Sequence, residues 1–156
     1  MDKISGQLLG TVLVVDDDEG VRKVLSRWIS DMGYGVKIAA DADSGLEMIR
    51  DNAIDVVLCD IRMPGHDGLW LLDQICRFYP ETAVALATGL MEMDPMVTLR
   101  PGVVGYIVKP FNRDDVSKVI GRGMVERKRL QAERPASSGP KMLTEGMLEG
   151  FVISRG

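Results

Sequence analysis

The chain lacks most of the residues from which histidine- and cysteine-based sites are built. Its 156 residues include one histidine, His66, and two cysteines, Cys59 and Cys76, with no CxxC pair and no Cys/His cluster. A single histidine excludes most His-based metal sites and disfavours a catalytic Ser-His-Asp arrangement. His66 stands in a loop, and we interpret it as an exposed polar residue. Both cysteines stand in apolar runs, so we interpret them as reduced, buried thiols that fill the core.

Long apolar runs and an excess of positive charge are missing too. No run approaches the roughly 20 apolar residues of a membrane span, and no apolar segment follows Lys3 as it would in a signal peptide. The formal net charge is −4, which argues against nonspecific nucleic-acid binding. These absences favour a cytoplasmic protein with no membrane contact and no direct DNA binding.

The residues that are present alternate between short strand-like runs and longer helical patterns. Apolar and β-branched runs predict five strands, at 11–15, 34–39, 54–59, 82–87 and 103–108. Apolar residues at helical spacing predict helices at 18–32, 43–51, 69–78 and from 112 onward. This alternation predicts an α/β fold, a doubly wound five-stranded parallel sheet with helices on both faces. For its strand order we take the flavodoxin-like order 2-1-3-4-5, in which the first and third strands are neighbours.

Polar side chains stand at the ends of four of the predicted strands. Asp16 and Asp17 follow the first strand, Asp60 the third, Thr88 the fourth and Lys109 the fifth. Because the carboxyl ends of parallel strands lie at one edge of a sheet, we expect these side chains to converge on one pocket.

This set of groups is suited to phosphoryl chemistry. Carboxylates this close raise each other's pKa unless a cation balances them, and an all-oxygen cluster open to solvent suits Mg²⁺. Mg²⁺ and Lys109 would neutralise the oxygens of an incoming phosphoryl group, and an aspartate carboxylate can attack phosphorus to give an acyl phosphate. Asp18 and Glu19, in contrast, suit the first turn of a helix through capping and the helix dipole.

Four segments carry a resemblance to a known family: VLVVDDDEGVRKVL, LCDIRMPGHDG, ALATG and GYIVKPF. In this order they resemble the receiver domains of two-component response regulators, over residues 10–130. The resemblance implies that Asp60 is the phosphoacceptor, in the pattern D-x-x-M-P-x-x-x-G. It also implies a Mg²⁺ site in which Asp17 binds the ion directly and Asp16 acts through water. Asp60 and the backbone carbonyl of Arg62 are the other implied ligands.

The same resemblance assigns roles to three residues near the ends of the last two strands. Thr88 is implied as the switch hydroxyl, Lys109 as the phosphate-pairing lysine, and Tyr106 as the aromatic side chain that changes rotamer on activation. The Lys109–Pro110 peptide bond is usually cis in this family. The implied partners are a sensor histidine kinase or a phosphotransfer protein upstream, and a downstream protein or output domain. A phosphorylation-dependent homodimer is a further expectation.

The two ends of the chain and one internal segment fall outside the repeating pattern. We expect residues 1–9 to be an N-terminal extension and residues 131–156 to be a linker and tail. The tail fits two hypotheses, a single-domain regulator and the receiver portion of a longer regulator whose output module starts here. The alanine-rich fourth helix usual in the family is missing. Segment 90–100 instead predicts either a short helix starting near Pro95 or an irregular stretch.

Three alternative functions remain open on the sequence. An Asp-nucleophile phosphohydrolase needs an acidic residue two positions after the nucleophile, where Arg62 stands. A flavin-binding module needs a Ser/Thr/Gly-rich phosphate loop after the first strand, where this chain is acidic. A degenerate, phosphate-independent interaction domain is favoured by the unusual segment 90–102 and disfavoured by the presence of all five site residues.

Overall fold

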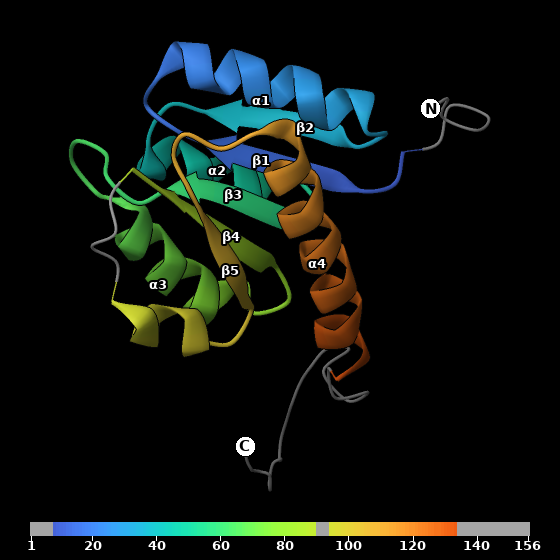
Figure 1. Cartoon of the computed structure of the whole chain (residues 1–156). Helices are drawn as coiled ribbons and strands as arrows, with labels where there is room; N and C mark the ends of the chain where they lie inside the picture. The colour runs from blue at the N-terminus through green and yellow to red at the C-terminus, as the bar shows by residue number, and fades with distance from the viewer. Residues whose placement is uncertain (1–7, 90–93, 134–156) are drawn as a thin grey trace, which may run out of the picture.

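The structure, a computed structural model, describes residues 8–89 and 94–133 and is centred on a five-stranded parallel sheet (Figure 1). The strand order is β2-β1-β3-β4-β5, which confirms the predicted order. The strands are β1 (Thr11–Val15), β2 (Gly35–Ala39), β3 (Val56–Asp60), β4 (Ala83–Thr88) and β5 (Val103–Val108).

Helices cover both faces of the sheet, as predicted. In the described residues they are α1 (Glu19–Asp31), α2 (Ala42–Asp51), α3 (Gly68–Phe78), α4 (Arg113–Ala132) and the short 3-10 helix η2 (Pro95–Leu99). Within residues 8–89 and 94–133, none of these helices has the length and apolar character needed to cross a membrane.

Successive side chains along each strand point to opposite faces of the sheet, and this builds two apolar layers. Val12 and Val14 of β1 belong to the layer that α1 and α4 cover, together with Leu25 and Ile120 of those helices. Leu13 of β1 points to the opposite layer, under α2 and α3. Since both faces are buried, the strands read as continuous apolar runs.

Each α-helix of the described residues begins at a side chain that caps it. The cap residues are Asp18, Asp41, Asp67 and Asn112, and each accepts a hydrogen bond from the backbone N–H three residues further on. Such caps satisfy N–H groups that have no partner within the helix. The predicted capping role of Asp18 is therefore confirmed, and Glu19 lies in the first turn.

Predicted and observed boundaries differ by one or two residues, and this difference places two site residues within strands. β3 extends to Asp60 and β4 to Thr88, because Asp60 still pairs with Ala87 and Thr88 with Val108. The strand predicted from residue 54 starts at Val56 in the structure. Asp55 lies just before it, where its backbone N–H donates to the carbonyl of Thr11 at 2.9 Å and its carboxylate accepts the N–H of Thr11 at 2.8 Å.

The segment before β5 is the least regular part of the described chain. Residues 90–93, the first part of the segment 90–100 discussed above, lie outside the described residues. η2 then starts at Pro95, which agrees with the first of the two predicted alternatives. The pairing of β4 with β5 shifts register after Val84, so that β5 contains a bulge, and Gly105 takes the φ of 140° that the bulge requires.

Candidate functional site

The carboxylates at the ends of the first and third strands meet in the structure. β1 and β3 are parallel neighbours, so their carboxyl ends lie side by side. Asp16, Asp17 and Asp60 each bring a carboxylate oxygen to within 4.8 Å of the others. Asp16 and Asp60 are nearly buried, with 2% and 7% of their surface exposed, whereas Asp17 is exposed.

Lys109 adds a positive charge to this cluster from the end of β5. Its Nζ lies 3.0 Å from Oδ2 of Asp16 and 3.4 Å from Oδ2 of Asp60. The backbone N–H of Lys109 donates to the carbonyl of Thr88 at 2.7 Å, which holds the two strand ends together. The Lys109–Pro110 peptide bond is cis, as the resemblance implies.

Burial and charge shift the titration of two of these groups. Burial raises the pKa of Asp60, and the neighbouring charge of Asp16 raises it further; Lys109 and the backbone N–H of Arg62 oppose this, but the pKa stays above its usual value. Burial by itself lowers the pKa of Lys109, yet its contacts with Asp16 and Asp60 outweigh burial and raise that pKa. Lys109 therefore stays cationic at neutral pH, while negative charge at Asp60 remains unfavourable without a further cation.

The donor atoms fit a magnesium ion. Three carboxylates with one exposed side match the oxygen ligands and retained waters of Mg²⁺. Asp16 is already engaged, because its Oδ1 accepts the backbone N–H of Asp18 at 2.9 Å and its Oδ2 accepts from Lys109. No hydrogen bond to the Asp17 carboxylate occurs within residues 8–89 and 94–133. Asp60 is engaged too, because Nζ of Lys109 lies 3.4 Å from its Oδ2 and the backbone N–H of Arg62 contacts its carboxylate. Of the three carboxylates, the exposed Asp17 is therefore the one most open to a cation.

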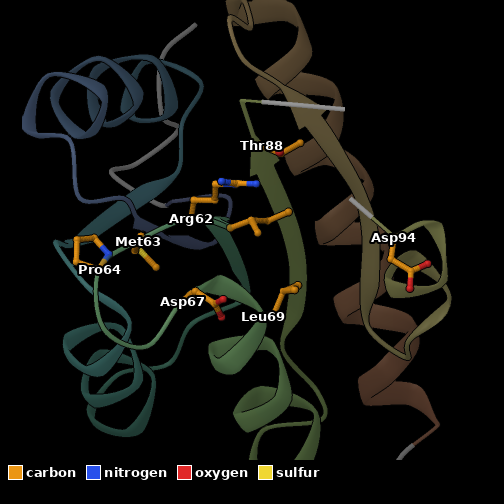
Figure 2. Close-up of a pocket in the computed structure, with 8 residues that line it drawn as sticks. Arg62, Met63, Pro64, Asp67, Leu69, Thr88 and Asp94 are labelled. Atoms are coloured by element: carbon orange, nitrogen blue, oxygen red, sulfur yellow. The ribbon is translucent and has the colours of Figure 1, made fainter. Parts of the chain in front are cut away.

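A pocket of about 700 Å³ lies against the loop that follows β3 and against the end of β4 (Figure 2). It is lined by the loop after β3, including Arg62 and Pro64, and by Thr88 at the end of β4. Asp94, just before η2, lines it as well. Thr88 is 5% exposed and follows Ala87, which pairs with Asp60. The structure thus places Thr88 and Arg62 in one pocket next to the end of β3, although Asp16, Asp17, Asp60 and Lys109 are not among the described residues that line it.

Gly68 allows helix α3 to begin directly against the end of β3. A Cβ atom at this position would lie 2.3 Å from the backbone oxygen of Asp60 and 2.8 Å from Cα of Ile61. The N–H of Gly68 also donates to the carbonyl of Ile61 at 2.8 Å, which closes the loop. The glycine of the D-x-x-M-P-x-x-x-G pattern is therefore required by close backbone approach.

Tyr106 is not brought into the pocket. It lies in β5 opposite Leu86 and is 41% exposed. Its predicted change of rotamer stays a prediction.

The three scarce residues noted in the sequence have structural roles. Cys59 is buried, as predicted, and burial raises the pKa of its thiol. The same prediction is wrong for Cys76, which is only half-buried because it lies at the edge of the core, with its Sγ 3.6 Å from the carbonyl of Pro101. His66 is exposed, as predicted; its Nδ1 lies 2.9 Å from Asp43 and its ring stacks on Trp70 at 3.8 Å.

Sequence reasoning missed one residue at the site, Arg22. Its Nη1 donates to the backbone carbonyl of Asp16 at 2.7 Å. The signal available in the sequence was a cation one helical turn after the cap residue Asp18, which places it over the start of α1.

The fold and the site correspond to a known family. The family described as "Response regulator receiver domain" matches residues 12–121, which is more than half of the chain. The chain belongs to this family. Its members are signalling modules of two-component systems, and the chain is therefore a receiver domain.

Individual relatives agree with this assignment. The chain is 31% identical over 126 residues to the transcriptional regulatory protein ZraR of Escherichia coli strain K12, covering 80% of the chain and 29% of that protein. It is 35% identical over 126 residues to the DNA-binding transcriptional regulator NtrC of the same strain, covering 80% of the chain and 27% of that protein. The chain thus spans less than a third of the length of these curated relatives.

Solved structures show the same fold. A CheY-like response regulator receiver domain protein from Methanospirillum hungatei JF-1 superposes with a TM-score of 0.72 at 30% identity, over 79% of this chain and 98% of that chain. NtrX from Brucella abortus, in complex with ATP, superposes with a TM-score of 0.72 at 34% identity, over 80% of this chain and 29% of that chain.

Proposed function

We propose that this receiver domain accepts a phosphoryl group on Asp60 in a Mg²⁺-dependent reaction. The observation that carries the proposal is the convergence of the Asp16, Asp17 and Asp60 carboxylates beside the ammonium of Lys109. The proposed donor is a phosphohistidine of a sensor histidine kinase or a phosphotransfer protein. The domain itself supplies the groups for its own phosphorylation and dephosphorylation.

In the proposed transfer, a carboxylate oxygen of Asp60 attacks phosphorus while the bond from phosphorus to the donor imidazole nitrogen breaks. The imidazole that leaves takes up a proton. Mg²⁺, held by Asp17, Asp60 and the backbone carbonyl of Arg62, would neutralise phosphoryl oxygens. Lys109, with Nζ 3.4 Å from Asp60, is placed to pair with another of these oxygens.

The proposed switch starts at Thr88. Its hydroxyl would donate to a phosphoryl oxygen on Asp60, since both residues end neighbouring strands at the same edge of the sheet. Tyr106 follows on β5 and changes rotamer, so that the face formed by η2, β5 and α4 shifts between two states. This face would contact a downstream protein or an output domain.

The experiment that tests the chemistry is treatment with a small acyl phosphate and Mg²⁺, followed by mass spectrometry of the intact protein. The wild type is expected to gain one phosphoryl group, and Asp60→Asn none, because an amide is not a nucleophile toward phosphorus. Asp18→Asn is the matched control: it removes a charge from the same acidic run but keeps a good helix cap. Labelling of Asp60→Asn at the level of Asp18→Asn contradicts the assignment.

Two results would favour the alternative functions of an interaction domain or a phosphohydrolase. A folded wild type that gains no phosphoryl group with Mg²⁺ supports the phosphate-independent interaction domain. Repeated turnover of a generic phosphate ester supports the phosphohydrolase, although the residue two positions after Asp60 is Arg62.

A further inference from the structure

Arg22 connects helix α1 to the acidic end of β1. It lies in the first turns of α1, where a long side chain points back toward the N-terminus of the helix. Its Nη1 reaches the backbone carbonyl oxygen of Asp16 at 2.7 Å. Asp16 is only 2% exposed, and a buried carbonyl of this kind requires a hydrogen-bond partner.

The carbonyl that Arg22 contacts belongs to the peptide group between Asp16 and Asp17. Because a peptide group is planar, its orientation is coupled to ψ of Asp16 and φ of Asp17, and so to the path of the backbone between the two carboxylates. The two neighbouring peptides are anchored separately. The N–H of Asp16 donates to Ala39 at 3.2 Å, and the N–H of Asp18 donates to Oδ1 of Asp16 at 2.9 Å. Arg22 provides the corresponding hydrogen bond for the Asp16–Asp17 peptide, which lies between these two peptides.

We infer that Arg22 is a positioning residue for the Mg²⁺ site: by holding the Asp16–Asp17 peptide, it directs both carboxylates toward Asp60. The inference rests on the proposed function, since that proposal assigns Mg²⁺ to these carboxylates. Partners of metal ligands that act in this way change metal affinity strongly although they do not touch the ion.

An effect of Arg22 through its charge and an effect through its position predict opposite changes in Mg²⁺ affinity when Arg22 is replaced. As a cation near three carboxylates, Arg22 repels Mg²⁺, so its removal should tighten Mg²⁺ binding if charge were its main effect. If Arg22 orients the Asp16–Asp17 peptide, its removal weakens Mg²⁺ binding, because the ligands must then be ordered on binding. The sign of the change in affinity therefore decides between the two.

The test is a Mg²⁺ titration of the full chain, followed by the backbone amide resonances of residues 16–18 and 60–62 in NMR spectra. For Arg22→Met we expect the dissociation constant to rise roughly tenfold. Lys23→Met is the matched control, because Lys23 is the next residue of α1 and, in the described part of the chain, pairs only with Glu19 at 3.5 Å, with both side chains more than 70% exposed. It removes the same charge and should leave the dissociation constant unchanged or slightly lower.

An unchanged or lower dissociation constant for Arg22→Met, in a folded protein, overturns the inference. If Arg22→Met does not fold, Arg22→Gln decides by the same criterion, since its amide is too short to reach the Asp16 carbonyl. A wild type that shows no Mg²⁺-dependent shifts refutes the proposed function. Wild-type binding with equal binding by the Arg22 variant refutes this inference alone.

Discussion

At the scale of single residues, Asp60 is a site residue that lowers the stability of the fold at neutral pH. Burial, and then the charge of Asp16, raise the pKa of Asp60 above the ordinary value of an aspartate. A raised pKa means that the folded protein holds the proton more tightly than the unfolded chain does. The ionised carboxylate therefore destabilises the fold at neutral pH, and this effect vanishes as the pH falls below the ordinary pKa of about 4.

Replacing the carboxylate with an amide should remove this destabilisation. We expect Asp60→Asn, without Mg²⁺, to raise Tm by a few degrees at neutral pH, and the difference from the wild type to shrink as the pH approaches about 4. Thermal unfolding in EDTA across this pH range measures it. Asp18→Asn, at the exposed cap, should show no such gain. A lower Tm for Asp60→Asn at neutral pH would show that its pairing with Lys109 outweighs burial.

At the scale of elements, α4 contains two glycines in contrasting surroundings. A Cβ at Gly123 would lie 2.8 Å from both methyl groups of Val56 on β3, whereas a Cβ at Gly121 would meet nothing within 4 Å. Gly123 therefore sets how closely the helix approaches the sheet. Gly121 has no comparable role in packing.

The two glycines form a matched pair for substitution. Gly121→Ala should stabilise the protein by about 0.5–1 kcal/mol, because alanine restricts the unfolded chain and favours the helix. Gly123→Ala should destabilise it by about 1–3 kcal/mol, because the added methyl overpacks the contact with Val56. Urea unfolding measures both changes. Equal effects of the two substitutions would argue against close packing of α4 on β3.

The succession of helices and strands along the chain follows from local sequence patterns. The boundaries of these elements were predicted to within two residues. The β5 bulge at Gly105 was not predicted. A bulge depends on the pairing of two strands that are far apart in sequence, and no periodicity within a single strand reports it.

At the scale of the whole molecule, Asp55 and Arg127 form an ion pair at the end of the sheet opposite the acidic site. This pair connects helix α4 to the sheet. The Arg127 guanidinium lies 3.2 Å from Asp55 and donates to the carbonyl of Glu81 at 2.8 Å. Asp55 in turn accepts the N–H of Thr11 at 2.8 Å. These contacts connect α4 to the starts of β1 and β3 and to the segment before β4, and the Arg127 side chain is only 16% exposed.

Loss of this connection should affect global stability. We expect Arg127→Met to destabilise the protein by about 2 kcal/mol, because Asp55 and the Glu81 carbonyl each lose a charged donor. Arg129→Met is the control on the same helix. Arg129 pairs with Glu126 and Glu133 at the surface, and exposed pairs contribute about 0–1 kcal/mol. Chemical denaturation should rank the two variants in this order, and the reverse order would contradict the assigned role of Arg127.

The sequence by itself determined the α/β class and which residues stand at the carboxyl edge of the sheet, because these properties depend on short periodic patterns and on where each strand ends. The order 2-1-3-4-5 was expected for a flavodoxin-like sheet, and the structure confirmed it. The convergence of Asp16, Asp17 and Asp60 follows from the same rule, and their individual roles remain predictions.

Only the tertiary structure decided how the acidic residues divide their contacts. Asp16 is held by Lys109, 93 positions away in the chain, and by Arg22, whereas Asp17 is left open to a cation. The outward position of Tyr106 and the approach of Gly68 to Asp60 were also decided at this level. The physical reason is that hydrogen bonds and steric contacts act over a few ångströms in space, and separation along the chain does not specify which groups come that close.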